Sequence, residues 1–275
     1  MIFDETQCAL GEGAIWHPER QQFFWFDILN RRFHTQDQHW DFDEYVSAAG
    51  WVDYDTFLIA SETQLFTFDM KTEEEIYVCG LESDNAQTRS NDGRADPQGG
   101  FWISTMSKTA EPKAGSIYRY YRGELRRLFG NLTTPNAICF APCGTVAYYA
   151  DTIAGKLMAT DLDADGWPSG KPRLIMDLSG EDFGIDGAVV DADGNIWNAQ
   201  WGAARVAQYA PDGTFLQAIS FPASQTSCPA FGGPNLSTLY CTSATENMDA
   251  PQPDDGKTFA TDTTTTGQAE HRVIV

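Results

Sequence analysis

Short runs of β-branched and aromatic residues, bounded by Gly, Pro, Asp or Asn, recur along the whole chain, and helical periodicity is hard to find. Runs of this kind, separated by turn residues, are typical of β-strands. The pattern therefore predicts an all-β protein. One six-residue run recurs in recognisable form and moves from apolar or aromatic to small or polar residues: FFWFDI, TFLIAS, GFWIST, AYYADT, NIWNAQ and TLYCTS.

The large residue of each run marks a repeat. The six markers are Phe24, Leu58, Trp102, Tyr148, Trp197 and Tyr240, with gaps of 34, 44, 46, 49 and 43 residues. Four antiparallel strands and their turns fill about 40–50 residues, the length of one β-propeller blade. The sequence therefore predicts a six-bladed β-propeller with four antiparallel strands per blade, formed by residues 1–275 as a single domain. A large sandwich or jelly roll with coincidental spacing is the alternative.

Two C-terminal segments stand outside the repeat. Residues 246–268 are polar and rich in Pro, Asp and Thr, which predicts a loose connection within the last blade and no chemistry. The strand-like run at 272–275 is expected to pair with strands of the N-terminal segment and lock the ring. Closing the ring removes the exposed sheet edges of an open all-β chain.

Charge narrows the range of partners. Eighteen Lys and Arg against thirty-nine Asp and Glu give a net charge of −21, whose field repels phosphate backbones and anionic membrane surfaces. Neither a nucleic-acid nor a membrane partner is expected. The N-terminus lacks a basic segment followed by an apolar run, and no apolar stretch of about 18 residues occurs, so we expect a cytoplasmic protein. We expect it to be a monomer or a small homo-oligomer.

Cysteine and histidine give no motif. The six cysteines contain no C-x-x-C pair, and the four histidines (His17, His34, His39 and His271) show no metal-ligand spacing. We therefore expect reduced core cysteines and histidines that are structural or exposed.

Polar residues recur in one slot of the repeat, eleven or twelve residues before the marker. The slot holds Glu12, Asn91, Asn136 and Asp186 in four repeats and falls near Ser47 and Cys228 in the other two. In a propeller, equivalent positions of the innermost strands converge on one mouth of the central channel. Two carboxylates and an amide oxygen there are hard ligands for a divalent cation, and three protein ligands leave positions open for water and substrate. The alternative is that each is a local turn former.

Arg89 lies two residues before Asn91 and so on the same face of a strand. Its guanidinium is suited to holding oxygen atoms of a polar substrate, or alternatively to neutralising the surrounding carboxylates.

These residues resemble the gluconolactonase, senescence-marker-protein (regucalcin) and luciferin-regenerating-enzyme family over most of the chain. The matching segments are LGEGAIW at 10–16, FWFDI at 24–28, RSNDGRADP at 89–97, GFWISTM at 100–106, PN at 135–136, ADT at 150–152, DG at 186–187 and DGNIW at 193–197. The resemblance implies a six-bladed propeller that holds one divalent metal ion. It also implies that the protein hydrolyses sugar lactones.

The resemblance also implies roles for individual residues. Glu12, Asn136 and Asp186 match the metal ligands of the family, whereas Arg89 and Asn91 match residues that contact substrate. The sequence departs from the family pattern at Ala137 and Ile185, where Gly and Pro are usual. It departs again in the substrate-binding set, where Thr109 with Lys108 beside it replaces a Glu, which affects the preferred sugar more than the reaction.

Lactone hydrolysis needs a polarised carbonyl and an activated water, both of which a divalent ion supplies. Asp186 is the best candidate for the general base, although another carboxylate in the cleft is not excluded. Oxygen ligands favour calcium, magnesium or manganese, and zinc or iron(II) remain open. The rival functions are an esterase or phosphotriesterase on the same propeller, and a non-catalytic calcium-binding protein.

Overall fold

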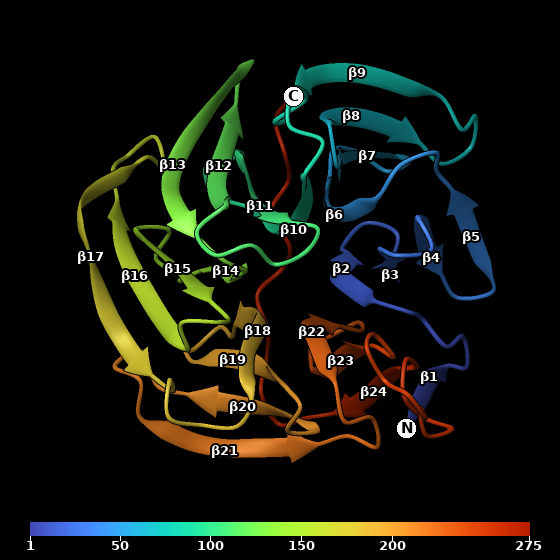
Figure 1. Cartoon of the computed structure of the whole chain (residues 1–275), viewed down its shortest axis with the longest axis vertical. Coiled ribbons are helices and arrows are strands. Elements are labelled where there is room, and N and C mark those ends of the chain that lie inside the picture. The colour runs from blue at the N-terminus through green and yellow to red at the C-terminus, as the bar shows by residue number, and fades with distance from the viewer.

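The computed structural model describes residues 1–275 and consists of six four-stranded antiparallel sheets arranged around a central axis (Figure 1). The predicted all-β fold with six blades is confirmed. Five blades follow the chain order from the innermost strand outward, and the sixth combines both ends of the chain in the order β22, β23, β24 and β1. No helix in the structure has the length and apolar character needed to span a membrane.

The strands of the first three blades have the following bounds. The first contains β2 (Gly11–His17), β3 (Gln22–Asp27), β4 (Arg32–Thr35) and β5 (Gln38–Asp41). The second contains β6 (Val46–Trp51), β7 (Thr56–Ser61), β8 (Gln64–Asp69) and β9 (Glu75–Gly80). The third contains β10 (Thr88–Ala95), β11 (Phe101–Ser107), β12 (Gly115–Tyr121) and β13 (Glu124–Leu132).

The other three blades complete the ring. The fourth contains β14 (Pro135–Phe140), β15 (Val146–Asp151), β16 (Lys156–Leu162) and β17 (Pro168–Asp177). The fifth contains β18 (Gly184–Val190), β19 (Ile196–Trp201), β20 (Arg205–Tyr209) and β21 (Phe215–Ser220). The sixth contains β22 (Thr226–Gly232), β23 (Thr238–Ser243), β24 (Thr258–Asp262) and β1 (Ile2–Asp4).

The recurring run that predicted the repeat is the second strand of every blade. All six markers lie on these strands, namely β3, β7, β11, β15, β19 and β23, and all six are buried. Second strands are covered by sheets on both faces, which explains why their sequences are continuously apolar instead of alternating.

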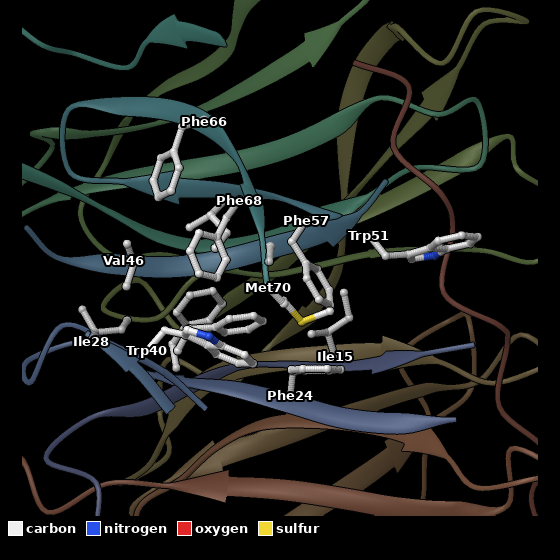
Figure 2. Packing of buried hydrophobic residues seen from close by; sticks show 14 of the residues in the cluster. Ile15, Phe24, Ile28, Trp40, Val46, Trp51, Phe57, Phe66, Phe68 and Met70 are labelled. Atoms are coloured by element: carbon white, nitrogen blue, oxygen red, sulfur yellow. The ribbon is translucent and has the colours of Figure 1, made fainter. Parts of the chain in front are cut away.

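Neighbouring blades are held together by interlocking aromatic side chains. Between the first two blades, Phe24 of β3 meets Phe57 of β7 edge-on with ring centroids 5.0 Å apart, and Trp40 of β5 meets Phe68 of β8 at 5.9 Å. Figure 2 shows these rings filling the space between the two sheets. Truncating such a buried ring to Ala typically costs about 3–5 kcal/mol of stability, so this packing fixes how the blades meet at the channel.

The ring is closed by the N-terminal strand. β1 pairs with β24 as the outermost strand of the sixth blade, with Ile2 opposite Phe259. The expectation that residues 272–275 pair with the N-terminal segment is wrong. The backbone amide of Val273 donates to the carbonyl of Trp51, and that of Ile274 donates to Gly99, so this segment lies against the second and third blades instead.

The C-terminal segment 267–275 therefore crosses the channel, as the red ribbon through the centre of Figure 1 shows. It passes the C-terminal ends of the innermost strands: the Gln268 amide donates to the carbonyls of Phe140 and Val190, and the Trp51 indole donates to the carbonyl of Glu270. We call residues 267–275 the C-terminal strap. It covers the channel end away from the candidate site.

The expectation of a loose connection over 246–268 is also wrong in part. Thr258–Asp262 form β24, the third strand of the sixth blade. β24 was not recognised in the sequence because it is short, follows a Pro- and Asp-rich segment, and mixes polar and apolar residues. This mixed polarity agrees with its partial burial.

Candidate functional site

The innermost strand of every blade has an irregular register at the same level of the channel. The irregularities lie between Glu12 and Ile15, Val46 and Ala48, Ser90 and Gly93, Asn136 and Cys139, Ile185 and Ala188, and Thr226 and Pro229. A β-bulge bends a strand locally and re-aims its side chains. The shared slot in the sequence thus corresponds to a ring of bulges at one end of the channel.

Two of these bulges use left-handed backbone. Gly13 and Ala137, which follow Glu12 and Asn136, both have φ of 58°. This conformation is readily available to glycine and strained for alanine, which fits the Gly that the family resemblance led us to expect at position 137. The local backbone keeps the left-handed turn despite the Ala, so Asn136 is held in place at a cost in strain.

All seven residues singled out in the sequence line one cavity of about 490 Å³ at this end of the channel. They are Glu12, Arg89, Asn91, Lys108, Thr109, Asn136 and Asp186. The five that lie on innermost strands are buried, whereas Lys108 and Thr109 are exposed at the rim. The structure therefore brings the whole set together, and their individual roles remain predictions.

Asn136 links the fourth blade, to which it belongs, to the fifth. Its amide nitrogen donates to Oδ1 of Asp186 at 2.6 Å and to the Thr152 hydroxyl at 3.2 Å, while its Oδ1 is buried without a hydrogen-bond partner. A buried acceptor without a partner is costly. This oxygen is therefore available for a cation, as are the carboxylate oxygens of Glu12 and Asp186.

The two carboxylates are buried close to other negative charges. Burial and the charge of Asp92 raise the pKa of Glu12 to about 8. Burial, followed by the charges of Glu12 and Asp92, raises the pKa of Asp186 well above its usual range. Like charges that are removed from water favour protonation unless a cation offsets them. The electrostatics of the site therefore match a positively charged ligand.

Arg89 is fixed beside this group by Asn91. The guanidinium Nη1 of Arg89 donates to Oδ1 of Asn91 and to the carbonyl of Ser90, both at 2.8 Å. The Asn91 amide in turn donates to the carbonyl of Pro135 in the next blade, at 3.2 Å. Both side chains are thus held rigidly at the wall of the cavity.

Lys108 and Thr109 lie on the loop after β11. The Lys108 ammonium lies 3.3 Å from a carboxylate oxygen of Glu62 and 5.8 Å from the centre of the Tyr45 ring. The Thr109 hydroxyl is 3.1 Å from that of Ser107. The long, exposed side chain of Lys108 can turn from Glu62 towards a bound molecule.

Sequence reasoning missed several residues that line the same cavity. Thr152 directly follows β15, Trp201 ends β19, and Glu246 follows β23 by three residues. Lys108 directly follows β11 in the same way. The missing signal was therefore the loop after the recurring run, because residues at or after the ends of five of the six second strands line this cavity. Glu246 adds a third carboxylate, within the segment to which no chemistry was assigned.

The chain is similar to known proteins over nearly its whole length. Residues 10–245 match the family model described as SMP-30/Gluconolactonase/LRE-like region. The chain is 41% identical over 268 residues to a presumptive sugar lactone lactonase of Rhizobium meliloti (strain 1021), covering 93% of this chain and 90% of that protein. It is 31% identical over 275 residues to 6-deoxy-6-sulfogluconolactonase of Pseudomonas putida, covering 95% and 94% respectively.

A solved structure is also similar over the full length. The calcium-binding protein regucalcin of Agrobacterium tumefaciens superposes with a TM-score of 0.97 at 38% identity, covering all of this chain and 97% of that one. The matched region contains all seven predicted site residues and the ring of bulges that positions five of them. The resemblance stated from the sequence is confirmed, and the chain belongs to the SMP-30/gluconolactonase/LRE-like family.

Proposed function

We propose that the chain is a sugar lactonase, in which a divalent metal ion bound by Glu12, Asn136 and Asp186 assists hydrolysis of an aldonolactone to the aldonic acid. The observation that carries the proposal is the unpartnered Oδ1 of Asn136 beside two buried carboxylates. Lactonase relatives that are 41% and 31% identical over nearly the whole chain support the reaction class.

The residues present suit a hard divalent cation. Three oxygen ligands from three blades fit calcium, magnesium or manganese, and zinc or iron(II) can occupy such a site where supply decides. The calcium-binding neighbour supports calcium as one candidate. The cation would also offset the repulsion between Glu12 and Asp186.

When bound, the ion supplies a Lewis acid that polarises the lactone carbonyl and lowers the pKa of a water molecule. Asp186 accepts the proton of the attacking water, whose oxygen bonds to the carbonyl carbon. The ring C–O bond then breaks, and the released alkoxide takes the proton that Asp186 had accepted, which gives the hydroxy acid and restores the Asp186 carboxylate. The hydrogen bond from Asn136 orients the Asp186 carboxylate for this transfer.

Side chains in the wall of the cavity orient the substrate. Arg89 and Asn91 hold ring hydroxyls, because both are buried, rigid and able to donate hydrogen bonds into the cavity. Lys108 and Thr109 meet the distal end of the sugar at the rim. One relative is named 6-deoxy-6-sulfogluconolactonase, a name that places an anionic sulfo group at a terminus of its sugar lactone. Lys108 suits such a group here.

The test is hydrolysis by metal-stripped protein, restored one ion at a time with gluconolactone, xylonolactone, a long-chain acyl lactone and an aryl phosphotriester. We expect turnover only with a divalent ion and only on the aldonolactones. The Glu12→Gln variant should have no lactonase turnover. The Glu19→Gln variant, which changes an exposed residue of the same blade, should retain this turnover. A preference for the acyl lactone or phosphotriester would favour another hydrolase. Metal binding without turnover would favour a non-catalytic calcium-binding protein.

A further inference from the structure

A second group of metal-ligating side chains lies away from the cavity. Cys8, Asp27 and His34 each offer a ligand atom, and these atoms all lie within 4.8 Å of one another. Cys8 belongs to the segment between β1 and β2, Asp27 ends β3, and His34 is on β4. None of the three lines the candidate lactone cavity, so the proposed lactonase chemistry does not account for them.

His34 is the feature of this cluster that most needs an explanation. Its side chain is buried, with only 4% of the residue exposed, and its Nε2 has no hydrogen-bond partner. The ring is stacked on Trp25, with centroids 5.3 Å apart and planes inclined by 12°. Burial lowers the pKa of His34 to about 4, so the imidazole is neutral near pH 7, which is the form that binds metals.

Asp27 is held in place by neighbouring donors. Its Oδ2 accepts hydrogen bonds from the backbone amide of Ala9 at 3.0 Å and from the side chain of Asn30 at 2.7 Å, and its Oδ1 accepts one from the amide of Leu10 at 3.1 Å. A fourth and longer hydrogen bond reaches Oδ1 from the backbone amide of Asn30 at 3.4 Å, so all of the about four acceptor sites of the carboxylate are used. A bound metal ion would displace this longest bond. Such outer hydrogen bonds orient a metal-binding carboxylate.

Cys8 completes the cluster from the N-terminal segment. It is fully buried, and burial together with the charge of Asp27 raises the pKa of its thiol. The thiolate therefore forms only when a cation is bound. Coordination replaces the S–H bond with a sulfur–metal bond and releases one proton to solvent.

A hollow on the surface reaches one member of the cluster, His34. It is lined by His34 together with Asp4, Glu5, Asp37 and His39, among others. Three acidic side chains at this opening attract cations. The other face of the cluster is apolar and includes Phe23, Trp25 and Tyr240, as in sites that shield a metal from solvent.

We propose that Cys8, Asp27 and His34 form a second metal site for a borderline-soft divalent ion of the Zn²⁺ type, with water from the surface hollow as the fourth ligand. Sulfur, nitrogen and oxygen ligands in a tetrahedral arrangement are typical of zinc. The site links the segment that connects β1 of the sixth blade with β2 of the first to strands β3 and β4. A bound ion would therefore strengthen the closure of the ring.

Cobalt absorption tests this site separately from the lactonase site, whose proposed ligands are all oxygen. Metal-free full-length protein is titrated with Co²⁺ while near-ultraviolet absorption is recorded. We expect a thiolate-to-cobalt charge-transfer band that saturates within two equivalents of Co²⁺, one for each proposed site, and is removed by Zn²⁺. Cys8→Ser should abolish the band, and His34→Gln should weaken Co²⁺ binding by more than the about 10–100-fold typical of outer-shell changes.

Cys143→Ser is the matched control, because Cys143 is exposed and far from the cluster in sequence. It should retain the band in full. The wild-type spectrum decides the question even if Cys8→Ser folds poorly. Absence of the band in wild-type protein, its persistence in Cys8→Ser or its loss in Cys143→Ser would each overturn the second site, whatever the outcome of the lactonase assays.

Discussion

Buried charged side chains are arranged differently at the two ends of the central channel. At the end where the innermost strands begin, Glu12 and Asp186 are buried with raised pKa values, and Arg89 is the single buried cation lining the cavity. At the other end, Arg94 pairs with Glu270 of the C-terminal strap, with the two side chains 11% and 8% exposed. The buried charged side chains thus form an ion pair at the end covered by the C-terminal strap. At the end where we expect a ligand, the buried carboxylates have no ion-pair partner.

The largest expected effect is at the unpaired end. Asp186→Asn should lower kcat on an aldonolactone by about 10²–10⁴-fold, the usual contribution of a general base. It should also raise the melting temperature of the metal-free protein at high pH, where an ionised Asp186 would be buried and repelled by neighbouring carboxylates. Steady-state kinetics and thermal denaturation measure the two effects.

Asp193→Asn is the control, since Asp193 is exposed in the same blade. It should change neither quantity. A destabilised Asp186→Asn protein with normal kcat would reverse the proposed division between the two ends of the channel.

The next effect is at the sealed end. Glu270→Gln leaves Arg94 buried without its partner, which typically costs about 3–5 kcal/mol. Urea denaturation should show this loss, while the folded variant keeps its kcat. Asp161→Asn breaks the exposed pair with Arg173, whose side chains are 65% and 48% exposed, and should cost less than about 1 kcal/mol. Equal losses of stability in the two variants would contradict the proposed importance of the buried ion pair.

The rim of the cavity should give a smaller effect, confined to binding. Lys108→Met should raise KM for a lactone with an anionic terminal group by about tenfold, equivalent to about 1.4 kcal/mol, and change KM for a neutral lactone much less. Lys171→Met removes an exposed lysine of the outer strand β17 and should alter neither constant. Equal effects of Lys108→Met on both lactones would remove the proposed charge recognition.

The smallest effect is a pH dependence at the sealed end. His17 ends β2, its Nε2 bonds the carbonyl of Asp53 at 2.9 Å, and burial lowers its pKa below 6.5. The neutral form is favoured in the folded state, so its stabilising contribution is complete above about pH 6.5 and falls as the pH drops towards the folded-state pKa. The loss is at most about 1.4 kcal/mol per pH unit.

Urea denaturation at pH 7.5 and 5.5 would measure this loss, and His17→Gln should reduce the difference between the two pH values. His39→Gln, an exposed change on β5, should leave it as in wild type. A difference unchanged in His17→Gln would assign the pH dependence to other groups.

The fold was predictable because the repeat is local. Six similar second strands, buried on both faces, repeat the same apolar run, and the bulged slot places Glu12, Asn136 and Asp186 at a constant offset from it. Glu246 and the C-terminal strap were not predictable, because each acts through contacts between segments far apart in the chain. Gln268, for example, bonds the carbonyls of Phe140 and Val190 through an ordinary polar side chain.

The clustering of Cys8, Asp27 and His34 was missed for the same reason. No spacing motif connects these residues, and they meet only because β3 and β4 form a hairpin against the segment that precedes β2.

The central claim is that Glu12, Asn136 and Asp186 share one cation at the open end of the channel. Anomalous diffraction from Mn²⁺-soaked crystals tests it most directly. The account predicts a single strong peak at this end, within about 2.0–2.6 Å of an oxygen of each side chain. No peak there at saturating Mn²⁺, or one that contacts only one of the three residues, would contradict it.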